Sequence, residues 1–195
     1  MNVPPPPATT ARTDVFQIKV LVLMGVSGCG KTEVGRAVAE RWGAAFQDGD
    51  DWHTAAAVAR MAGGTPLSDV ERAPWLERLR EKVVEATPVG GRTVLACSAL
   101  RRKYREALAG GAAGVRVVYL AGSRELIGAR LAERRGHYMP AGLLDSQFAA
   151  LEVPGAEEAV AVSIAGTVPE VAEEVMRAAG LDYCGEWADR GREGR

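Results

Sequence analysis

A glycine-rich segment near the beginning of the chain has the residue types that hold the phosphates of a nucleotide. Residues 25–32 read Gly-Val-Ser-Gly-Cys-Gly-Lys-Thr and fit the pattern G-x-x-x-x-G-K-[ST]. Small residues let successive backbone N–H groups turn towards an anion, and the N-terminus of a following helix adds partial positive charge. A lysine in this position reaches the β- and γ-phosphates, and the next hydroxyl can ligate Mg²⁺. The pattern predicts that ATP and Mg²⁺ are bound here, by Gly25, Val26, Ser27, Gly28, Cys29, Gly30, Lys31 and Thr32.

A run of acidic residues supplies candidate chemistry beside those phosphates. Asp48, Asp50 and Asp51 follow closely on a short predicted strand. In phosphoryl transfer, one carboxylate organises Mg²⁺ and its waters, and another orients the acceptor hydroxyl and takes its proton. We assign the metal role to Asp48 and the acceptor role to Asp50, which makes Lys31 and Asp50 the first catalytic candidates. On the sequence alone the roles of Asp48 and Asp50 can be exchanged. The plainer alternative to a catalytic site is a solvated acidic turn.

Two motifs that mark other classes of nucleotide-binding protein are absent from the sequence. The only asparagine is Asn2, so the guanine-reading motif N-K-x-D cannot be present. The strand predicted at 92–97 runs into Ser98-Ala99-Leu100, where many ATPases carry a Walker-B aspartate. The sequence therefore favours a small-molecule kinase over a GTPase switch or an ATP-driven motor.

The hydrophobic pattern places these segments in an α/β protein. Short apolar runs rich in Val and Leu alternate with longer amphipathic segments, which is typical of a parallel sheet covered by helices on both faces. The predicted strands span residues 18–24, 44–47, 92–97, 115–120 and 159–164. The predicted helices span residues 31–42, 54–62, 69–86, 100–109, 124–134, 143–151 and 168–179, with Asp69 as an N-cap and Gly180 ending the last helix. The glycine-rich segment thus lies between a strand and a helix.

Length and composition indicate one globular domain. The 195 residues include 24 basic and 25 acidic side chains, and this balance offers no electrostatic footprint for nucleic acid or an anionic membrane. Three widely spaced cysteines form no disulfide framework and no metal-ligand spacing, which favours the cytoplasm. No apolar run approaches the ~20 residues that span a bilayer. We expect a disordered Pro-rich segment at 1–16, a P-loop kinase domain at 17–181 and a flexible tail at 182–195.

Six ordered blocks of sequence, the first of which overlaps the glycine-rich segment, resemble the gluconate kinase family of P-loop proteins. They are Met24–Gly28, Phe46–His53, Met61–Asp69 with Arg72–Leu76, Cys97–Leu100 with Tyr104-Arg105, Arg134–Met139, and Leu143–Phe148 with Leu151–Pro154. The resemblance implies transfer of a phosphoryl group from ATP to D-gluconate, giving 6-phospho-D-gluconate and ADP. It also implies a nucleoside-monophosphate-kinase-like fold and a homodimer. The chain departs from the family at Thr54 and Ala57, where Pro and Asn are usual, and this bears on how strictly it selects gluconate.

Several polar residues in these blocks are candidates for binding an open-chain sugar acid, which needs a cation for its carboxylate and hydrogen-bonding groups for its hydroxyls. His53 is a candidate hydroxyl or carboxylate contact, and Arg60 would give the carboxylate a charge-assisted donor. Ser98 ends a strand, where ligands bind in such sheets. Gln147 resembles a substrate contact of the family. The plainer alternatives are that His53 only fixes its own loop and that Arg60 lies on a solvated helix face.

An arginine-rich segment from about 130 to 142 is expected to form a mobile lid. Arg130 and Arg134 are four residues apart and share a face of a helix. On closure Arg134 would stabilise charge on the transferring phosphoryl group and help to exclude water, so it joins the catalytic candidates. His137, in the same segment, is a further candidate for binding the substrate.

Two further expectations concern the surroundings of the cleft. The basic run formed by Arg101, Arg102, Lys103 and Arg105 is expected to be mostly a solvated helix face, with one member meeting the substrate carboxylate. The adenine is expected beside Pro154-Gly155.

The residues leave two other functions open. One is a kinase for another small polyol acid such as shikimate, and the other is a nucleotide-dependent sensor that has lost catalysis. The intact set Lys31, Thr32, Asp48 and Asp50 argues against the sensor.

Overall fold

The centre of the molecule is a parallel β-sheet. The computed structural model describes residues 17–133 and 141–187. The strands β1 (Val20–Met24), β2 (Ala45–Asp48), β3 (Thr93–Ala96), β4 (Val115–Ala121) and β5 (Val160–Ser163) lie in the order β2-β3-β1-β4-β5. Every neighbouring pair is parallel, and Val20 of β1 is in register with Thr93 on one side and Val115 on the other. The five-stranded parallel sheet predicted from the sequence is confirmed.

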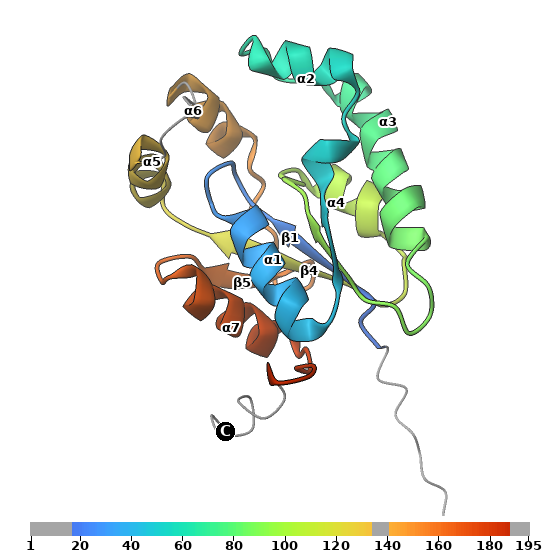
Figure 1. Cartoon of the computed structure of the whole chain (residues 1–195). Helices are drawn as coiled ribbons and strands as arrows, with labels where there is room; N and C mark the ends of the chain where they lie inside the picture. Colours follow the sequence, from blue (N-terminus) through green and yellow to red (C-terminus); the bar gives the residue numbers. More distant parts are fainter. Residues whose placement is uncertain (1–16, 134–140, 188–195) are drawn as a thin grey trace, which may run out of the picture.

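Helices cover both faces of this sheet (Figure 1). The helices α1 (Lys31–Trp42) and α7 (Val168–Ala179) lie against one face. The helices α3 (Asp69–Leu79) and α4 (Arg102–Ala109) lie against the other, and α3 continues as a π-helix over Arg80–Glu85. The remaining helices α2 (Ala55–Ala62), α5 (Arg124–Glu133) and α6 (Ala141–Ala150) stand beyond the edge at which the parallel strands end.

The strand β1 is buried along its whole length because each of its faces supports a separate core. Leu21 and Leu23 pack with the side chains of α1 and α7. Val20, Val22 and Met24 pack with side chains of α3 and α4. Fully burying one such side chain stabilises the fold by roughly 1.5–3 kcal/mol. Burial on both faces explains why the sequence of β1 is apolar without polar alternation.

The start of α3 differs from the sequence-based expectation. Asp69 was predicted to cap this helix, and that prediction was wrong. The N-cap is Ser68, whose hydroxyl accepts from the Glu71 N–H at 3.4 Å, while the Glu71 carboxylate accepts from the Ser68 N–H at 2.8 Å. This reciprocal pair is a capping box, and its S-x-x-E signature is present in the sequence. The Asp69 side chain is therefore available for contacts with α4.

The basic run of α4 is only partly a solvated face. Arg102 and Lys103 are exposed as expected, but the Arg105 side chain is only 5 % exposed. Its guanidinium pairs with the Glu158 carboxylate and donates to the carbonyls of Ala99, Leu100 and Glu152. Arg105 thus connects α4 with the segment after β3 and the segment before β5 inside the protein.

The chain after α7 folds back on α1. The Cys184 N–H donates to the Arg41 carbonyl at 2.8 Å, and the Arg41 guanidinium lies 4.9 Å from the centroid of the Trp187 ring. The expected flexible tail at 182–195 is therefore held against α1 over residues 182–187. The rest of that tail, the Pro-rich segment at 1–16 and the core of the predicted lid at 134–140 lie outside the described residues.

Within residues 17–133 and 141–187, no helix is both long and apolar enough to cross a membrane. The cytoplasmic location expected from the cysteine usage stays a prediction.

Replacing Arg105 by Ala should destabilise the protein strongly. The change removes the buried partner of the mostly buried Glu158 carboxylate, which keeps only the exposed Arg102 at 3.3 Å, and it removes the Arg105 donor from the carbonyls of Ala99 and Glu152. We expect the free energy of unfolding to fall by about 3 kcal/mol in urea denaturation. Arg102→Ala is the matched control, since its side chain is 60 % exposed, and it should change the value by no more than about 0.5 kcal/mol. Equal effects of the two substitutions would contradict the internal role of Arg105.

Candidate active site

The glycine-rich segment is folded as a loop that bends around a central space before α1 begins. Gly25, Gly28 and Gly30 have φ angles of 148°, 83° and 92°, which residues with a side chain rarely adopt. At Gly28 a Cβ atom would also come within 2.7 Å of the Leu131 Cγ atom of α5. These glycines let the backbone N–H groups and the N-terminus of α1 face the same space.

The loop and the acidic segment meet at the end of the sheet. The Lys31 ammonium lies over the loop and donates to the carbonyls of Gly25 and Val26, at 3.0 Å each. The Thr32 hydroxyl donates to Asp48 Oδ2 at 2.8 Å. Since Asp48 is the last residue of β2, this bond joins the two segments singled out from the sequence.

The backbone of the acidic segment forms a packed turn, from which the exposed residues Asp50 and Asp51 project. Asp48 Oδ1 accepts from the Asp50 N–H at 3.1 Å, which starts a 3₁₀ turn over Gly49–Trp52. The Trp75 indole N–H of α3 donates to the Gly49 carbonyl at 2.8 Å. A Cβ atom on Gly49 would lie 2.7 Å from the Ala96 carbonyl oxygen of β3. The turn is thus held from below by the sheet and from the side by α3.

His53 stands next to this turn as a neutral side chain. Its ring stacks on the Trp75 ring, with centroids 4.3 Å apart and 16° between the planes. Desolvation by burial lowers the pKa of His53, against a smaller raising effect of Asp50. The buried Nδ1 atom has no hydrogen-bond partner among the described residues. At neutral pH His53 can therefore meet a hydroxyl but supplies no positive charge to a carboxylate.

A cleft of about 1010 Å³ opens between the loop, the acidic turn, α2, α3, α4 and α6. It brings together six of the site residues predicted from the sequence, which are Ser27, Lys31, Asp50, His53, Ser98 and Gln147. It also contains two guanidinium groups on the wall formed by α3 and α4, those of Arg72 and Arg101.

Gln147 crosses the cleft to the phosphate-binding loop. Its Oε1 atom accepts from the Ser27 N–H at 2.6 Å, although the two residues are 120 positions apart. This contact joins α6 to the loop.

Arg60 is not part of this cleft. It lines a neighbouring cavity of about 560 Å³ with His53 and is paired with Glu71 at 3.1 Å. Arg134 and His137 lie outside the described residues, so their predicted roles stay predictions.

Arg72, to which no role was assigned from the sequence, lines the cleft that Arg60 does not reach. Arg72 Nε donates to the Leu67 carbonyl at 3.3 Å, and its guanidinium lies 5.7 Å from the centroid of the Tyr104 ring. The available signal was the spacing of Asp69 and Arg72, which are three residues apart and so share one face of α3.

A second cavity, of about 350 Å³, lies on the other side of the loop. It is lined by loop residues such as Gly28 and by the segment after β5, including Thr167. The Arg130 guanidinium donates to the carbonyls of Ile164 and Gly166 at 2.6 and 3.0 Å and so orders one wall. Pro154 and Gly155, where the adenine was expected, do not line it. They precede β5, whereas the carboxyl end of this parallel strand faces the loop.

Comparison with known proteins agrees with this geometry. A family model described as an AAA domain matches residues 20–154. The gluconokinase of Gluconobacter oxydans is 45% identical over 161 residues, which cover 82% of this chain and 90% of that protein. The chain belongs to the gluconokinase family. This membership is consistent with a P-loop kinase that uses a nucleotide and a small-molecule substrate.

Solved structures extend the comparison. A gluconokinase of Sinorhizobium meliloti shares 38% sequence identity and a TM-score of 0.75, covering 83% of this chain and 91% of that one. A shikimate kinase of Bacteroides thetaiotaomicron has a TM-score of 0.60 over 84% of this chain and 99% of that one, at 15% identity. At that identity the second likeness shows the shared fold alone. The predicted fold class is thereby confirmed, and so is the resemblance to the gluconokinase family.

Substituting Gly49 by Ala should displace the acidic turn. The added Cβ atom would meet a backbone oxygen of β3 at 2.7 Å, so the turn has to move and carry Asp50 with it. A displacement of about 1 Å in a reacting group costs on the order of 100-fold in rate. We expect at least a tenfold loss of kcat in an ATP-consumption assay with gluconate.

The control for this substitution is Gly128→Ala in α5. The nearest atom to a Cβ at that position is Leu144 Cδ2 at 3.9 Å, and alanine favours the helix over glycine by up to ~1 kcal/mol. Unchanged activity in Gly49→Ala would contradict the tight packing of the turn.

Proposed function

We propose that this protein is a gluconokinase that transfers the γ-phosphoryl group of ATP to D-gluconate, giving 6-phospho-D-gluconate and ADP. The observation that carries the proposal is the composition of one cleft. It joins Lys31 at the phosphate-binding loop, the Asp50 carboxylate and the two guanidinium groups of Arg72 and Arg101. A donor site for phosphate, a carboxylate for a hydroxyl and cations for a second anion are the groups that phosphorylation of a sugar acid requires.

The nucleotide and its metal would be held by the loop. Gly25–Thr32 offers backbone N–H groups and the Lys31 ammonium for the phosphates, in a segment whose φ angles suit glycine. Thr32 and Asp48 offer two oxygen ligands at one point, which suits Mg²⁺. No larger cluster of acidic, His or Cys ligands occurs among the described residues. Two protein ligands fit an ion that keeps several waters and binds substrate phosphates. The ion would neutralise negative charge on those phosphates.

Asp50 is the better candidate for the group that orients the acceptor hydroxyl. Both oxygens of Asp48 already have donors, the Thr32 hydroxyl and the Asp50 N–H. Asp50 lines the cleft and faces the space beside Lys31. A carboxylate there can accept the proton of the hydroxyl as it attacks phosphorus. The sequence left open which of the two carboxylates binds the metal. These contacts favour Asp48 as the metal ligand and Asp50 as the group at the acceptor hydroxyl.

The carboxylate of gluconate would bind at the α3–α4 wall. Arg72 and Arg101 line the cleft, whereas Arg60 lies in the neighbouring cavity and is paired with Glu71. A guanidinium offers two parallel N–H donors that match a carboxylate. The neutral side chains of His53, Ser98 and Gln147 would then serve the hydroxyl groups.

The lid and the quaternary structure belong to the same proposal. Arg134 would neutralise charge on the transferring phosphoryl group, and His137 would contact the substrate, when the segment from about 130 to 142 covers the cleft. We also propose the homodimer that the family resemblance implies.

A panel of acceptors tests the proposal against its alternatives. ATP consumption should be seen with D-gluconate and should be at least 100-fold lower in kcat/KM with shikimate, because the cleft must match the length of an open-chain acid. Turnover of shikimate but not gluconate would favour the second kinase. ATP binding without phosphorylation of any sugar acid would favour the sensor.

Substitutions of Lys31 and Asp50 separate nucleotide binding from proton transfer. Asp50→Asn should lower kcat with gluconate by about 100-fold or more while ATP still binds, since general base catalysis contributes 10²–10⁴-fold. Lys31→Ala should lower kcat and also weaken the binding of ATP, because it removes a charge at the phosphates.

Asp51→Asn is the matched control, since it neutralises the adjacent carboxylate, to which no catalytic role is assigned. It should change kcat less than fivefold. Full gluconate turnover in Asp50→Asn would exclude Asp50 as the base.

A further inference from the structure

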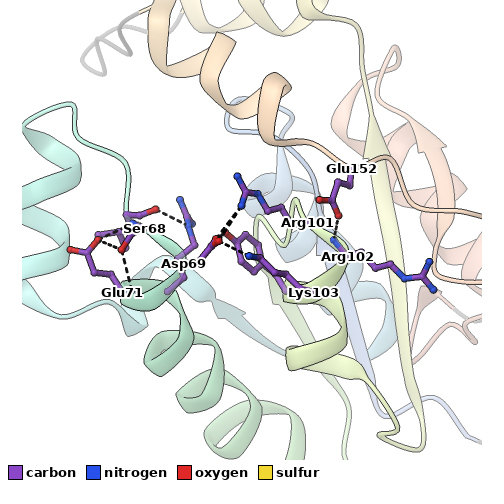
Figure 2. A network of polar contacts seen from close by, with 10 residues as sticks. Ser68, Asp69, Glu71, Arg101, Arg102, Lys103 and Glu152 are labelled. Atoms are coloured by element: carbon purple, nitrogen blue, oxygen red, sulfur yellow. Dashed lines mark hydrogen bonds and ion pairs between the residues drawn. The ribbon is translucent and has the colours of Figure 1, made fainter.

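Three donors from the first turn of α4 converge on one carboxylate at the start of α3 (Figure 2). Asp69 accepts hydrogen bonds from Arg101 Nη1, which is 3.2 Å from each of its oxygens, and from the Lys103 ammonium and the Tyr104 hydroxyl. Asp69, Arg101 and Tyr104 all line the cleft. Neither the phosphate-binding loop nor the acidic turn accounts for this cluster.

The cluster keeps Asp69 ionised. The hydrogen bonds from Lys103 and Tyr104 lower the pKa of Asp69 to about 2. Asp69 is also the first residue of α3, where the helix N-terminus favours a negative charge. At neutral pH a carboxylate therefore stands beside the Arg101 guanidinium.

The backbone around Arg101 is fixed by other residues. Arg105 donates to the Leu100 carbonyl at 3.2 Å, and the Glu152 N–H donates to that carbonyl at 2.9 Å. The Glu152 carboxylate accepts from the Arg102 N–H at 2.7 Å and so serves the start of α4 (Figure 2). These contacts set the path of the chain, whereas the Arg101 side chain is directed by its contacts with Asp69 and the Tyr104 ring.

Two cations share the wall of the cleft at this point. The Arg72 and Arg101 guanidinium groups lie 5.7 and 6.0 Å from the centroid of the same Tyr104 ring. The two guanidinium groups carry like charge, which favours turning one of the side chains out to solvent. The Asp69 carboxylate offsets this effect by its opposite charge, and its two hydrogen bonds from Arg101 Nη1 restrict the rotamers of Arg101.

We propose that Asp69 is a positioning residue that holds Arg101 in the cleft, ready to bind the carboxylate of the sugar acid. The inference rests on the proposed function, since the ligand it concerns is the acceptor. It assigns Asp69 no contact with the substrate and no part in proton transfer. Its effect is on the binding of the acceptor and not on that of ATP.

Asp69→Asn tests the role with little change of shape. Asparagine keeps one acceptor oxygen but loses the charge that orients the guanidinium. We expect the KM for gluconate to rise about tenfold, the loss typical of a charge-assisted contact, while the KM for ATP changes less than twofold. Asp69→Glu, which restores the charge, should give a KM for gluconate closer to that of the unaltered protein. Thermal midpoints of all variants show that the folded protein is being compared.

Glu152→Gln is the matched control, because Glu152 also binds the first turn of α4 but touches no guanidinium in the cleft. It should leave both KM values within twofold. If Glu152→Gln raised the KM for gluconate as much as Asp69→Asn does, general disturbance of α4 would explain the effect and the proposal would fail.

A double-mutant cycle with Arg101 gives the sharper test. Arg101→Ala should itself raise the KM for gluconate, and adding Asp69→Asn to it should cause no further rise, since the residue through which Asp69 acts is gone. A further tenfold rise in the double variant would overturn the proposal. An unaltered protein that turns over no gluconate would overturn the proposed function together with this role, whereas an unchanged KM in Asp69→Asn would overturn the positioning role alone.

Discussion

The hydrogen bond between the Thr32 hydroxyl and the Asp48 carboxylate joins the two halves of the site, and its formation depends on the architecture of the sheet. Thr32 lies in the first turn of α1, which follows β1, and Asp48 ends β2, yet β3 lies between these strands. The bond can form only because parallel strands end at one edge of the sheet. Register matters as well, since Leu23 and Asp48 are both aligned with Ala96 of β3. A slip of β2 by one residue would turn the Asp48 side chain to the opposite face of the sheet.

The helix α3 couples the stability of the core to the geometry of the site. Trp75 is buried in the core beneath the sheet, stacks on His53 and donates to the Gly49 carbonyl. One side chain thus packs the fold, supports the acidic turn and keeps the adjacent imidazole neutral by burial. The same packing leaves the Gly49 position no room for a side chain. Changes in this part of the core are therefore expected to reach the reaction centre.

The cleft carries charges of both signs on different elements. Lys31 belongs to the phosphate-binding loop, Asp50 to the acidic turn, and Arg72 and Arg101 to the wall formed by α3 and α4. Two anionic molecules can then occupy one cleft, each facing its own cations. Asp69 accepts a hydrogen bond from Arg101 on this wall, as Asp48 accepts one from Thr32 at the loop.

Local sequence determined most of the elements and the phosphate-binding end of the site. The helices at Lys31–Trp42 and Val168–Ala179 begin and end where predicted, and Gly180 ends the latter with a φ angle of 66°. The loop could be recognised because its glycines act through their own backbone angles. The capping box of Ser68 and Glu71 carried an equally local signal, which the assignment to Asp69 overlooked.

Only the tertiary structure decided which cations line the cleft and which are internal. Arg60, Arg72, Arg101 and Arg105 look alike in the sequence, but the packing of α2, α3 and α4 sends them to a side cavity, the cleft and the interior. Their surroundings come from residues that are distant in the chain, as in the pairs of Asp69 with Arg101 and of Arg105 with Glu158. The sequence by itself determined that phosphate is bound, because that site is built from consecutive backbone groups. The opposite wall is built from side chains of separate helices, so its composition follows from how those helices pack.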